Sequence, residues 1–109
     1  MAYAVVLTTD AARDVREIDA YIAWRDSAEA ACAVVEGLGQ VLAGLGENPQ
    51  RGNYPKELLA LGIREFRETH FKPYRVIYRV IDQTVYIMCV ADGRRNMQRL
   101  LLKRLVQVQ

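Results

Sequence analysis

The sequence predicts a small α+β domain: an N-terminal strand, an antiparallel helical hairpin, a three-stranded antiparallel meander that completes a small sheet, and a C-terminal helix. Two observations predict this order. Apolar residues recur every three or four positions in the first half of the chain, and they alternate with polar residues in the second half. The length of 109 residues suits one domain, placed at residues 1–109, and 51% apolar residues are typical of a globular protein.

A strand and a first helix are predicted at the start of the chain. Tyr3 to Thr8 is expected to form the strand. Thr9 or Asp10 then supplies a side-chain acceptor for the unpaired amides at a helix start. Three apolar residues recur at helical spacing after this point, which predicts a helix that continues through Trp24.

A second helix is predicted after a short connection, so the two helices form an antiparallel hairpin. Asp26, followed three residues later by Glu29, resembles a capping box. Apolar residues then step by four, three, four and three positions and form one stripe, which comprises Ala31, Val35, Leu38, Leu42 and Leu45. Gly46, as a left-handed cap, and Pro49, as a helix breaker, are expected to end this helix.

The second half of the chain predicts a loop, three strands and a helix. The loop spans residues 48–62, and the strands are expected at residues 63–71, 74–81 and 84–90. Short turns join these strands, which must therefore pair antiparallel. A turn at Asp92-Gly93 precedes a basic amphipathic helix expected at residues 94–106. The helices can then cover one face of the sheet and leave the other partly open.

Within the strand at residues 74–81, side chains alternate between the two faces of the sheet. Arg75, Ile77 and Arg79 share one face, and the residues between them share the other. Two interpretations of Arg75 and Arg79 remain open. They either form ion pairs with Glu65, Glu68 or the acidic helices, or they contact a ligand or a partner protein.

The formal net charge of +2 hides a division between the two halves. Residues 1–50 carry three basic and eight acidic groups, a net charge of −5, and residues 51–109 carry twelve basic and five acidic groups, a net charge of +7. Such asymmetry predicts contact between the basic half and something anionic, either a nucleic acid or an acidic protein surface.

Several classes of protein are not expected. No apolar run approaches the roughly 18 residues that span a bilayer, and the N-terminus does not resemble a signal peptide, so we expect a cytoplasmic protein without a membrane partner. Cys32 and Cys89 occupy apolar positions and are interpreted as buried thiols. With His70 as the one histidine, a metal site is not expected, and no motif indicates a cofactor.

Five short segments carry a resemblance to a known family. They are Ala11-Ala12-Arg13-Asp14, Asn48-Pro49-x-x-Gly52, Gly62-Ile63-Arg64-Glu65, the strand from Tyr74 to Val80, and Asp92-Gly93-Arg94-Arg95. In this order and spacing they resemble the RelE/ParE superfamily of bacterial type II toxins over essentially the whole chain. The resemblance implies a toxin of a plasmid stabilisation or addiction module. It also implies a cognate antitoxin whose C-terminal segment wraps around the toxin in a hetero-oligomer.

One branch of that superfamily, the RelE-like toxins, cuts mRNA inside the ribosome and thereby blocks translation. This chemistry needs cations that stabilise the charged transition state and a group that moves protons. The resemblance lets Arg67, Arg75 and Arg95 match the basic positions, with His70 as a replacement acid or base. Leu101 occupies the position, six residues after Arg95, where a catalytic tyrosine is expected.

The other branch, the ParE-like toxins, inhibits DNA gyrase by binding it, which needs no group that transfers protons. The sequence favours this branch, because Leu101 is apolar and carboxylates flank Arg67. A non-toxic basic binding domain on the same scaffold is a further alternative. The basic side chains expected to contact a target or the antitoxin are Arg64, Arg67, Arg75, Arg79, Arg94, Arg95, Arg99 and Lys103.

Overall fold

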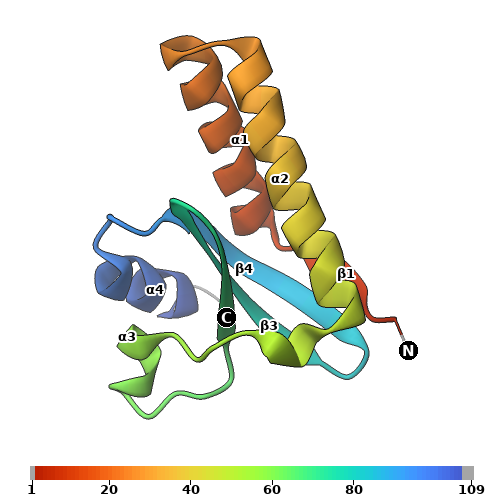
Figure 1. Ribbon diagram of the computed structural model, residues 1–109. Coiled ribbons are helices and arrows are strands. Elements are labelled where there is room, and N and C mark those ends of the chain that lie inside the picture. Colours follow the sequence, from red (N-terminus) through yellow and green to blue (C-terminus); the bar gives the residue numbers. More distant parts are fainter. Residues whose placement is uncertain (1, 107–109) are drawn as a thin grey trace.

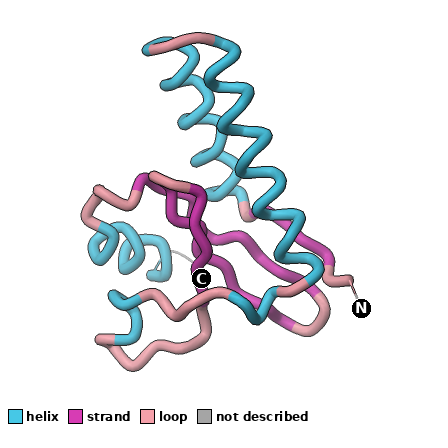
Figure 2. Tube along the Cα trace, viewed as in Figure 1, coloured by secondary structure: helices cyan, strands magenta, loops and turns pink. Residues whose placement is uncertain are grey.

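The computed structural model describes residues 2–106 and confirms the α+β prediction (Figures 1 and 2). One four-stranded sheet has the strand order β1-β4-β3-β2. Strand β1 (Ala4–Leu7) pairs parallel with β4 (Thr84–Asp92). Strand β3 (Tyr74–Ile81) pairs antiparallel with both β4 and β2 (Arg67–Phe71), as the short turns predict.

Helices α1 (Thr9–Arg25) and α2 (Ala28–Glu47) form the predicted hairpin, which extends beyond the sheet in Figure 1. Both predicted N-caps are wrong: Thr8 caps α1 in place of Thr9 or Asp10, and Ser27 caps α2 in place of Asp26. The Thr8 hydroxyl accepts a hydrogen bond from the Ala11 amide at 3.2 Å. The Ser27 hydroxyl accepts one from the Ala30 amide at 3.0 Å, so Asp26 does not cap α2. In each case the capping residue is the last one with an extended backbone.

The prediction of Gly46 as a left-handed cap is also wrong. Gly46 lies inside α2, where a Cβ atom would come within 3.0 Å of the Tyr3 carbonyl oxygen. The Tyr3 amide donates a hydrogen bond to the Gly46 carbonyl oxygen at 2.7 Å. Glycine is therefore needed here because the start of the chain passes close to the helix. Pro49 follows as predicted and begins the short 3-10 helix η1 (Pro49–Arg51).

The predicted loop contains a further helix, α3 (Lys56–Leu59), and β2 begins four residues later than expected. The Ile63 amide donates a hydrogen bond to the Leu58 carbonyl oxygen at 2.9 Å, so Ile63 caps the end of α3 instead of pairing in the sheet. Helix α4 (Met97–Val106) likewise begins three residues late, because the Asn96 side chain accepts the Arg99 amide and marks the helix start.

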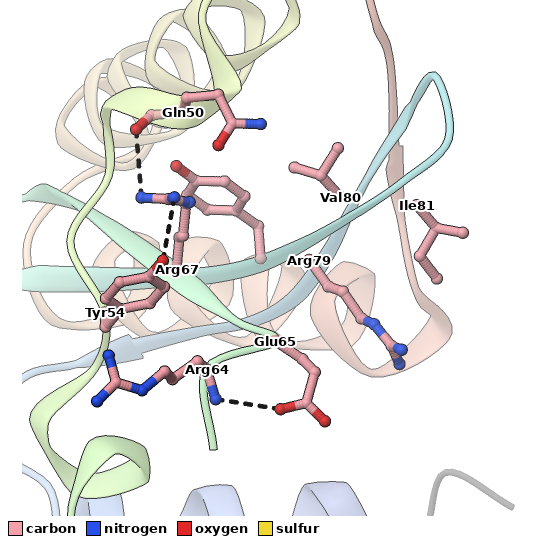
Figure 3. A pocket seen from close by; sticks show the side chains of 9 residues that line it. Gln50, Tyr54, Arg64, Glu65, Arg67, Arg79, Val80 and Ile81 are labelled. Atoms are coloured by element: carbon pink, nitrogen blue, oxygen red, sulfur yellow. Dashed lines mark hydrogen bonds between the residues drawn. The ribbon is translucent and has the colours of Figure 1, made fainter. Parts of the chain in front are cut away.

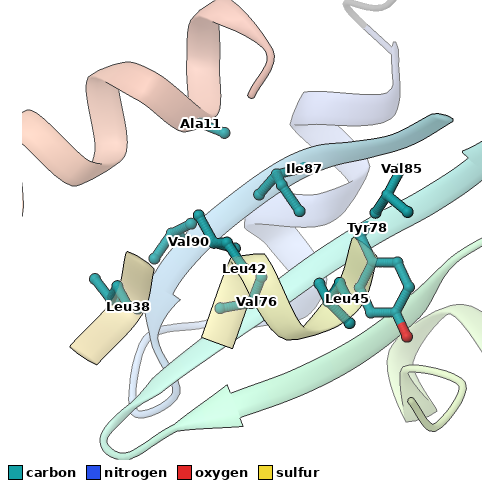
Figure 4. Packing of buried hydrophobic residues seen from close by; sticks show 9 residues of the cluster. All are labelled: Ala11, Leu38, Leu42, Leu45, Val76, Tyr78, Val85, Ile87 and Val90. Carbon is teal, nitrogen blue, oxygen red and sulfur yellow. The ribbon is translucent and has the colours of Figure 1, made fainter. Parts of the chain in front are cut away.

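Helices cover both faces of the sheet, which corrects the expectation of one open face. On one side, α1 and α2 pack on residues such as Val76 and Tyr78 (Figure 4). On the other, α3 and α4 contribute to a second apolar cluster that comprises Leu58, Phe66, Ile77, Cys89, Ala91, Met97 and Leu101. Any site on the sheet must therefore lie at its edges or ends.

A β-bulge in β4 joins these two layers. Tyr78 pairs with Ile87 but Ile77 pairs with Cys89, so Met88 is an extra residue without a partner on β3. Arg104 of α4 donates a hydrogen bond to the Met88 carbonyl oxygen at 3.0 Å.

The carboxylate of Asp14 on α1 completes this junction. It accepts the Val90 amide at 2.9 Å and one guanidinium nitrogen of Arg104 at 2.6 Å. The side chain of Asp14 is 7% exposed and that of Arg104 is 14% exposed. One ion pair thus satisfies the backbone of the bulge and ties α1, β4 and α4 together.

Helix α2 corrects the expectation about apolar runs. By length and composition alone it could cross a membrane. The core helix of a soluble protein passes the same test, and Leu38, Leu42 and Leu45 of α2 belong to the core cluster that packs on the sheet.

Replacing Asp14 should strongly destabilise the fold. In Asp14→Ala, Arg104 remains largely buried and keeps only the distant carboxylate of Asp10, at 3.9 Å, so we expect a loss of about 3–5 kcal/mol in the free energy of unfolding, measured by urea denaturation. Asp19→Ala is the matched control, because Asp19 is exposed on the same helix; about 0.5 kcal/mol or less is expected there. Equal losses in the two variants would contradict the role assigned to the pair.

The two cysteines should react very differently. Cys89 is buried as predicted, and burial raises the pKa of its thiol to about 11. Cys32 is exposed, against the prediction, because its position on α2 faces away from the sheet. A thiol reagent should therefore label one cysteine in the native protein and both after unfolding. Cys32→Ser should abolish the native labelling; persistent labelling would show that Cys89 is accessible.

Candidate target and antitoxin interface

Arg75 is held by two carboxylates on the α3–α4 side of the sheet. Both terminal nitrogens of its guanidinium donate to Glu57 at 2.8 Å, and Nε donates to Glu68 at 2.7 Å. The hydrogen bond to Glu57 raises the pKa of Arg75, and Arg75 in turn lowers the pKa of Glu57. The side chain of Arg75 is 12% exposed. The pair with Glu68 was one of the predicted alternatives; Glu57 was not foreseen, because it lies 18 residues away on a helix that periodicity does not reveal.

Arg67 and Arg75 lie on opposite faces of the sheet. Arg67 pairs with Tyr78, which packs beneath α1 and α2, whereas Arg75 pairs with His70 on the other face. His70 is half-exposed, and its Nε2 lies 3.7 Å from a Glu68 oxygen. The structure therefore does not bring Arg67 together with Arg75 and His70, as a single phosphate-binding site would require.

Arg67 and Tyr78 instead organise the segment that leads out of α2. The Arg67 guanidinium donates to the carbonyl oxygens of Gln50 and Gly52, at 3.3 and 2.8 Å, and it lies over the Tyr54 ring at 4.7 Å. The buried Tyr78 hydroxyl donates to the Pro49 carbonyl oxygen at 2.7 Å and accepts the Gly52 amide. Sequence analysis placed Tyr78 on the correct face but gave no indication of this role.

A pocket of about 420 Å³ opens at this end of the sheet (Figure 3). Three of the predicted arginines, Arg64, Arg67 and Arg79, line it. The Arg79 guanidinium lies 5.7 Å from the centre of the Phe66 ring. No ion pair within residues 2–106 engages Arg64, Arg67 or Arg79. This pocket therefore gathers three arginines, together with the carboxylate of Glu65, which accepts a hydrogen bond from the Arg64 amide at 3.1 Å.

The remaining predicted cations lie after β4 and on α4. Arg94 forms an ion pair with Asp92, and this hydrogen bond lowers the pKa of Asp92 to about 2. Arg94 and Arg95 line a second pocket, of about 380 Å³, beside Tyr21 and Tyr74. The exposed cationic side chains of this region are Arg94, Arg95, Arg99 and Lys103.

Leu101 lies on the opposite side of α4, where it is 2% exposed within the second apolar cluster. Arg104, which the predicted interface omits, also points inward and pairs with Asp14. Across residues 2–106, no group of three or more His, Cys, Asp or Glu side chains is placed to hold a metal ion. The exposed charged groups on α4 are thus cationic, and they suit contact with an anionic surface.

Comparison with known proteins decides the family. Residues 5–97 match the family model described as "ParE toxin of type II toxin-antitoxin system, parDE". The chain belongs to the ParE toxin family. It is a toxin of a type II toxin–antitoxin system of the ParE/RelE type, and an antitoxin is its partner. A comparison with curated proteins yields no significant match.

Three solved structures are similar to this ParE-family toxin. The chromosomal ParDE system of P. aeruginosa aligns with a TM-score of 0.71 and 18% identity, over 84% of this chain and 96% of that one. The RelBE2 toxin–antitoxin complex of Mycobacterium tuberculosis aligns with a TM-score of 0.58 and 27% identity, over 84% of this chain and 92% of that one. An E. coli RelE mutant in the free state aligns with a TM-score of 0.68 and 18% identity, over 100% of both chains. The two matches at 18% identity show a shared fold.

The pair of Arg75 and Glu57 should make stability depend on pH. The pKa of Glu57 is lowered in the folded protein, so its contribution is complete above the unfolded value of about 4.5 and is lost as the pH falls through the folded value. Glu57→Gln should lower the free energy of unfolding by about 1.5–3 kcal/mol at neutral pH, and by progressively less below about pH 4.5. Urea denaturation at several pH values measures this. Glu47→Gln, at an exposed position, is the control. If the difference in unfolding free energy between Glu57→Gln and the wild type stayed constant across the pH range, the assignment would be contradicted.

Proposed function

We propose that this ParE-family toxin inhibits DNA gyrase by binding it and does not cleave RNA. One observation carries the proposal: Arg75, the middle cation of the set that RNA cleavage would use, is held by two carboxylates. The positive charge of this guanidinium is already balanced by the two carboxylates, so it would stabilise a phosphorane-like transition state poorly, and the carboxylates would repel the scissile phosphate.

The surroundings of Arg75 support the same proposal. RNA cleavage by the 2′-hydroxyl requires a base, an acid and converging cations. Leu101, at the position where the resemblance expects a tyrosine, has a hydrocarbon side chain that can neither donate nor accept a proton, and it is buried among Phe66 and Met97. His70 is exposed, but the sheet separates it from Arg67.

Binding to a protein target would use the outward face of α4 and the turn before it. Arg95, Arg99 and Lys103 are exposed there, and the large apolar side chain of Leu102 is 39% exposed between them. Cations around an exposed apolar residue are a composition that suits a protein interface with an acidic partner. We propose this face as the gyrase-binding surface. The proposed location is the cytoplasm, where gyrase acts, and the proposed role of the module is plasmid stabilisation.

Induction of the toxin in bacteria, with pulse labelling of DNA, RNA and protein, tests the proposal. DNA synthesis should fall first, and the purified toxin should block supercoiling by gyrase in vitro without cleaving mRNA on ribosomes. Rapid loss of protein synthesis accompanied by cleaved mRNA would overturn the proposal in favour of the RelE-like alternative. Growth without inhibition would overturn both targets.

Substitutions on α4 separate the two mechanisms further. Arg95→Ala and Arg99→Ala should each weaken inhibition of supercoiling by about two- to tenfold, because rim cations of a binding surface contribute modestly and in a graded manner. Arg16→Ala, at an exposed position on α1, should change nothing. In a nuclease, Arg95→Ala would instead remove about 10²-fold or more of the cleavage rate.

A further inference from the structure

Two aromatic side chains near the end of α1 are exposed to solvent. Tyr21 is 54% exposed and Trp24 is 80% exposed, and their ring centres lie 6.3 Å apart. The last turn of α1, which carries Trp24, belongs to the part of the hairpin that extends beyond the sheet (Figure 1). Neither side chain belongs to the apolar clusters that residues 2–106 form, so the fold gains little from them. Exposed tryptophan and tyrosine are the side chains that most often carry the binding energy of a protein interface.

Tyr21 also lines the pocket of about 380 Å³ beside Arg94 and Arg95. This pocket lies between α1 and the adjoining ends of β3 and β4. Its apolar lining comprises Ile18, Tyr21, Pro73, Tyr74, Val90 and Ala91. A concave apolar surface therefore continues from the exposed aromatic pair toward the turn before α4, and its volume suits one large side chain of a partner.

The charges around this pocket largely cancel. Asp14 belongs to the buried ion pair that joins the two layers, and Asp92 pairs with Arg94. Glu17 and Arg95 carry opposite charges, and neither forms an ion pair within residues 2–106. The lining thus holds more carboxylates than arginines, which disfavours the row of phosphates of a nucleic acid. Aromatic rings beside balanced charges suit a protein partner instead.

We propose that Tyr21 and Trp24 are the apolar anchor of the surface that binds gyrase, and that the adjoining pocket accepts an apolar side chain of gyrase. The inference rests on the proposed function and deepens it, because Arg95 belongs both to this pocket and to the cationic surface of α4. An acidic side chain of gyrase next to the apolar one would pair with Arg95. Since Glu17 would repel that acid from the α1 side, it must approach over α4.

A second copy of the toxin fits this surface poorly. Full burial of the exposed parts of the two rings would remove roughly 300 Å² from each molecule, since aromatic side chains bury about 150–250 Å² each. A specific interface needs about 800 Å² per partner. A two-fold dimer that extended the contact over α4 would bring Arg95, Arg99 and Lys103 of both copies together, and like charges would oppose it.

Alanine variants test the anchor. Trp24→Ala and Tyr21→Ala should each weaken the affinity for purified gyrase by about tenfold or more, measured by calorimetry, with a matching loss of supercoiling inhibition. Trp24→Phe keeps an aromatic ring and should stay within a few-fold of the wild type. Ile81→Ala is the matched control, because Ile81 is an apolar side chain, 42% exposed, beside the β3–β4 turn; its affinity should be unchanged. Thermal unfolding of each variant verifies its fold.

The possible results separate the anchor from the target. If the toxin inhibits gyrase and Trp24→Ala binds as tightly as Ile81→Ala, the anchor is wrong and the proposed function stands. A wild-type toxin that does not bind gyrase would overturn both. If Trp24→Ala loses antitoxin binding or self-association but keeps its affinity for gyrase, the pair serves that other partner and the inference fails.

Fluorescence reports the same contact without a substitution, because Trp24 is the one tryptophan of the chain. In toxin that carries 5-hydroxytryptophan at this position, the label can be excited apart from the tryptophans of gyrase. Acrylamide should quench it strongly in the free toxin and about threefold less in the complex, since an interface anchor is shielded from water. Equal quenching in the free and the bound toxin would contradict the proposal.

Discussion

The ion pair between Asp14 and Arg104 is the interaction on which the two-layered arrangement depends. The bulge at Met88 leaves backbone groups of the central strand β4 without partners on β3, and these groups need hydrogen bonds because they are covered on both faces. Arg104 supplies a donor to Met88, and Asp14 supplies an acceptor to Val90. The same pair holds α4 against the sheet, so the packing of Met97 and Leu101 on one face depends on a residue of α1 that approaches from the other.

Closure of the α3–α4 face changes what the basic residues can do. Once α3 lies over the sheet, Glu57 reaches Arg75, and a cation that the sequence offered as a catalytic group becomes part of the structure. The arginines that remain available lie at the β2–β3 edge and on the outside of α4. The +7 charge of the second half is therefore divided between internal ion pairs and two separate surfaces, a distribution that favours binding proteins over cleaving RNA.

Periodicity predicted most of the fold, because each element has one apolar face that must be buried. The stripe of α2 and the alternation of β3 correspond to the observed elements, and the short turns predicted the antiparallel meander. Helix α3 was missed because four residues do not reveal a period. Of the candidate site, residue types and faces were predictable, including the opposition of Arg75 and Val76. The sequence could not predict which arginines form ion pairs inside the fold, because the carboxylate partner of each lies far away in the chain.

The sequence by itself determined the order of the strands and of the three longer helices, and the uneven charge, since these follow from local spacing and residue type; its short motifs carried the resemblance to the family. Only the tertiary structure decided the fate of individual side chains. Arg75 and Arg79 look equivalent in the strand pattern, yet Arg75 is held by two carboxylates, whereas Arg79 lines a pocket and forms no ion pair within residues 2–106. The physical reason is that charge availability depends on distances between residues that are remote in the chain. Glu57 and Arg75 are 18 positions apart, and Asp14 and Arg104 are 90 apart.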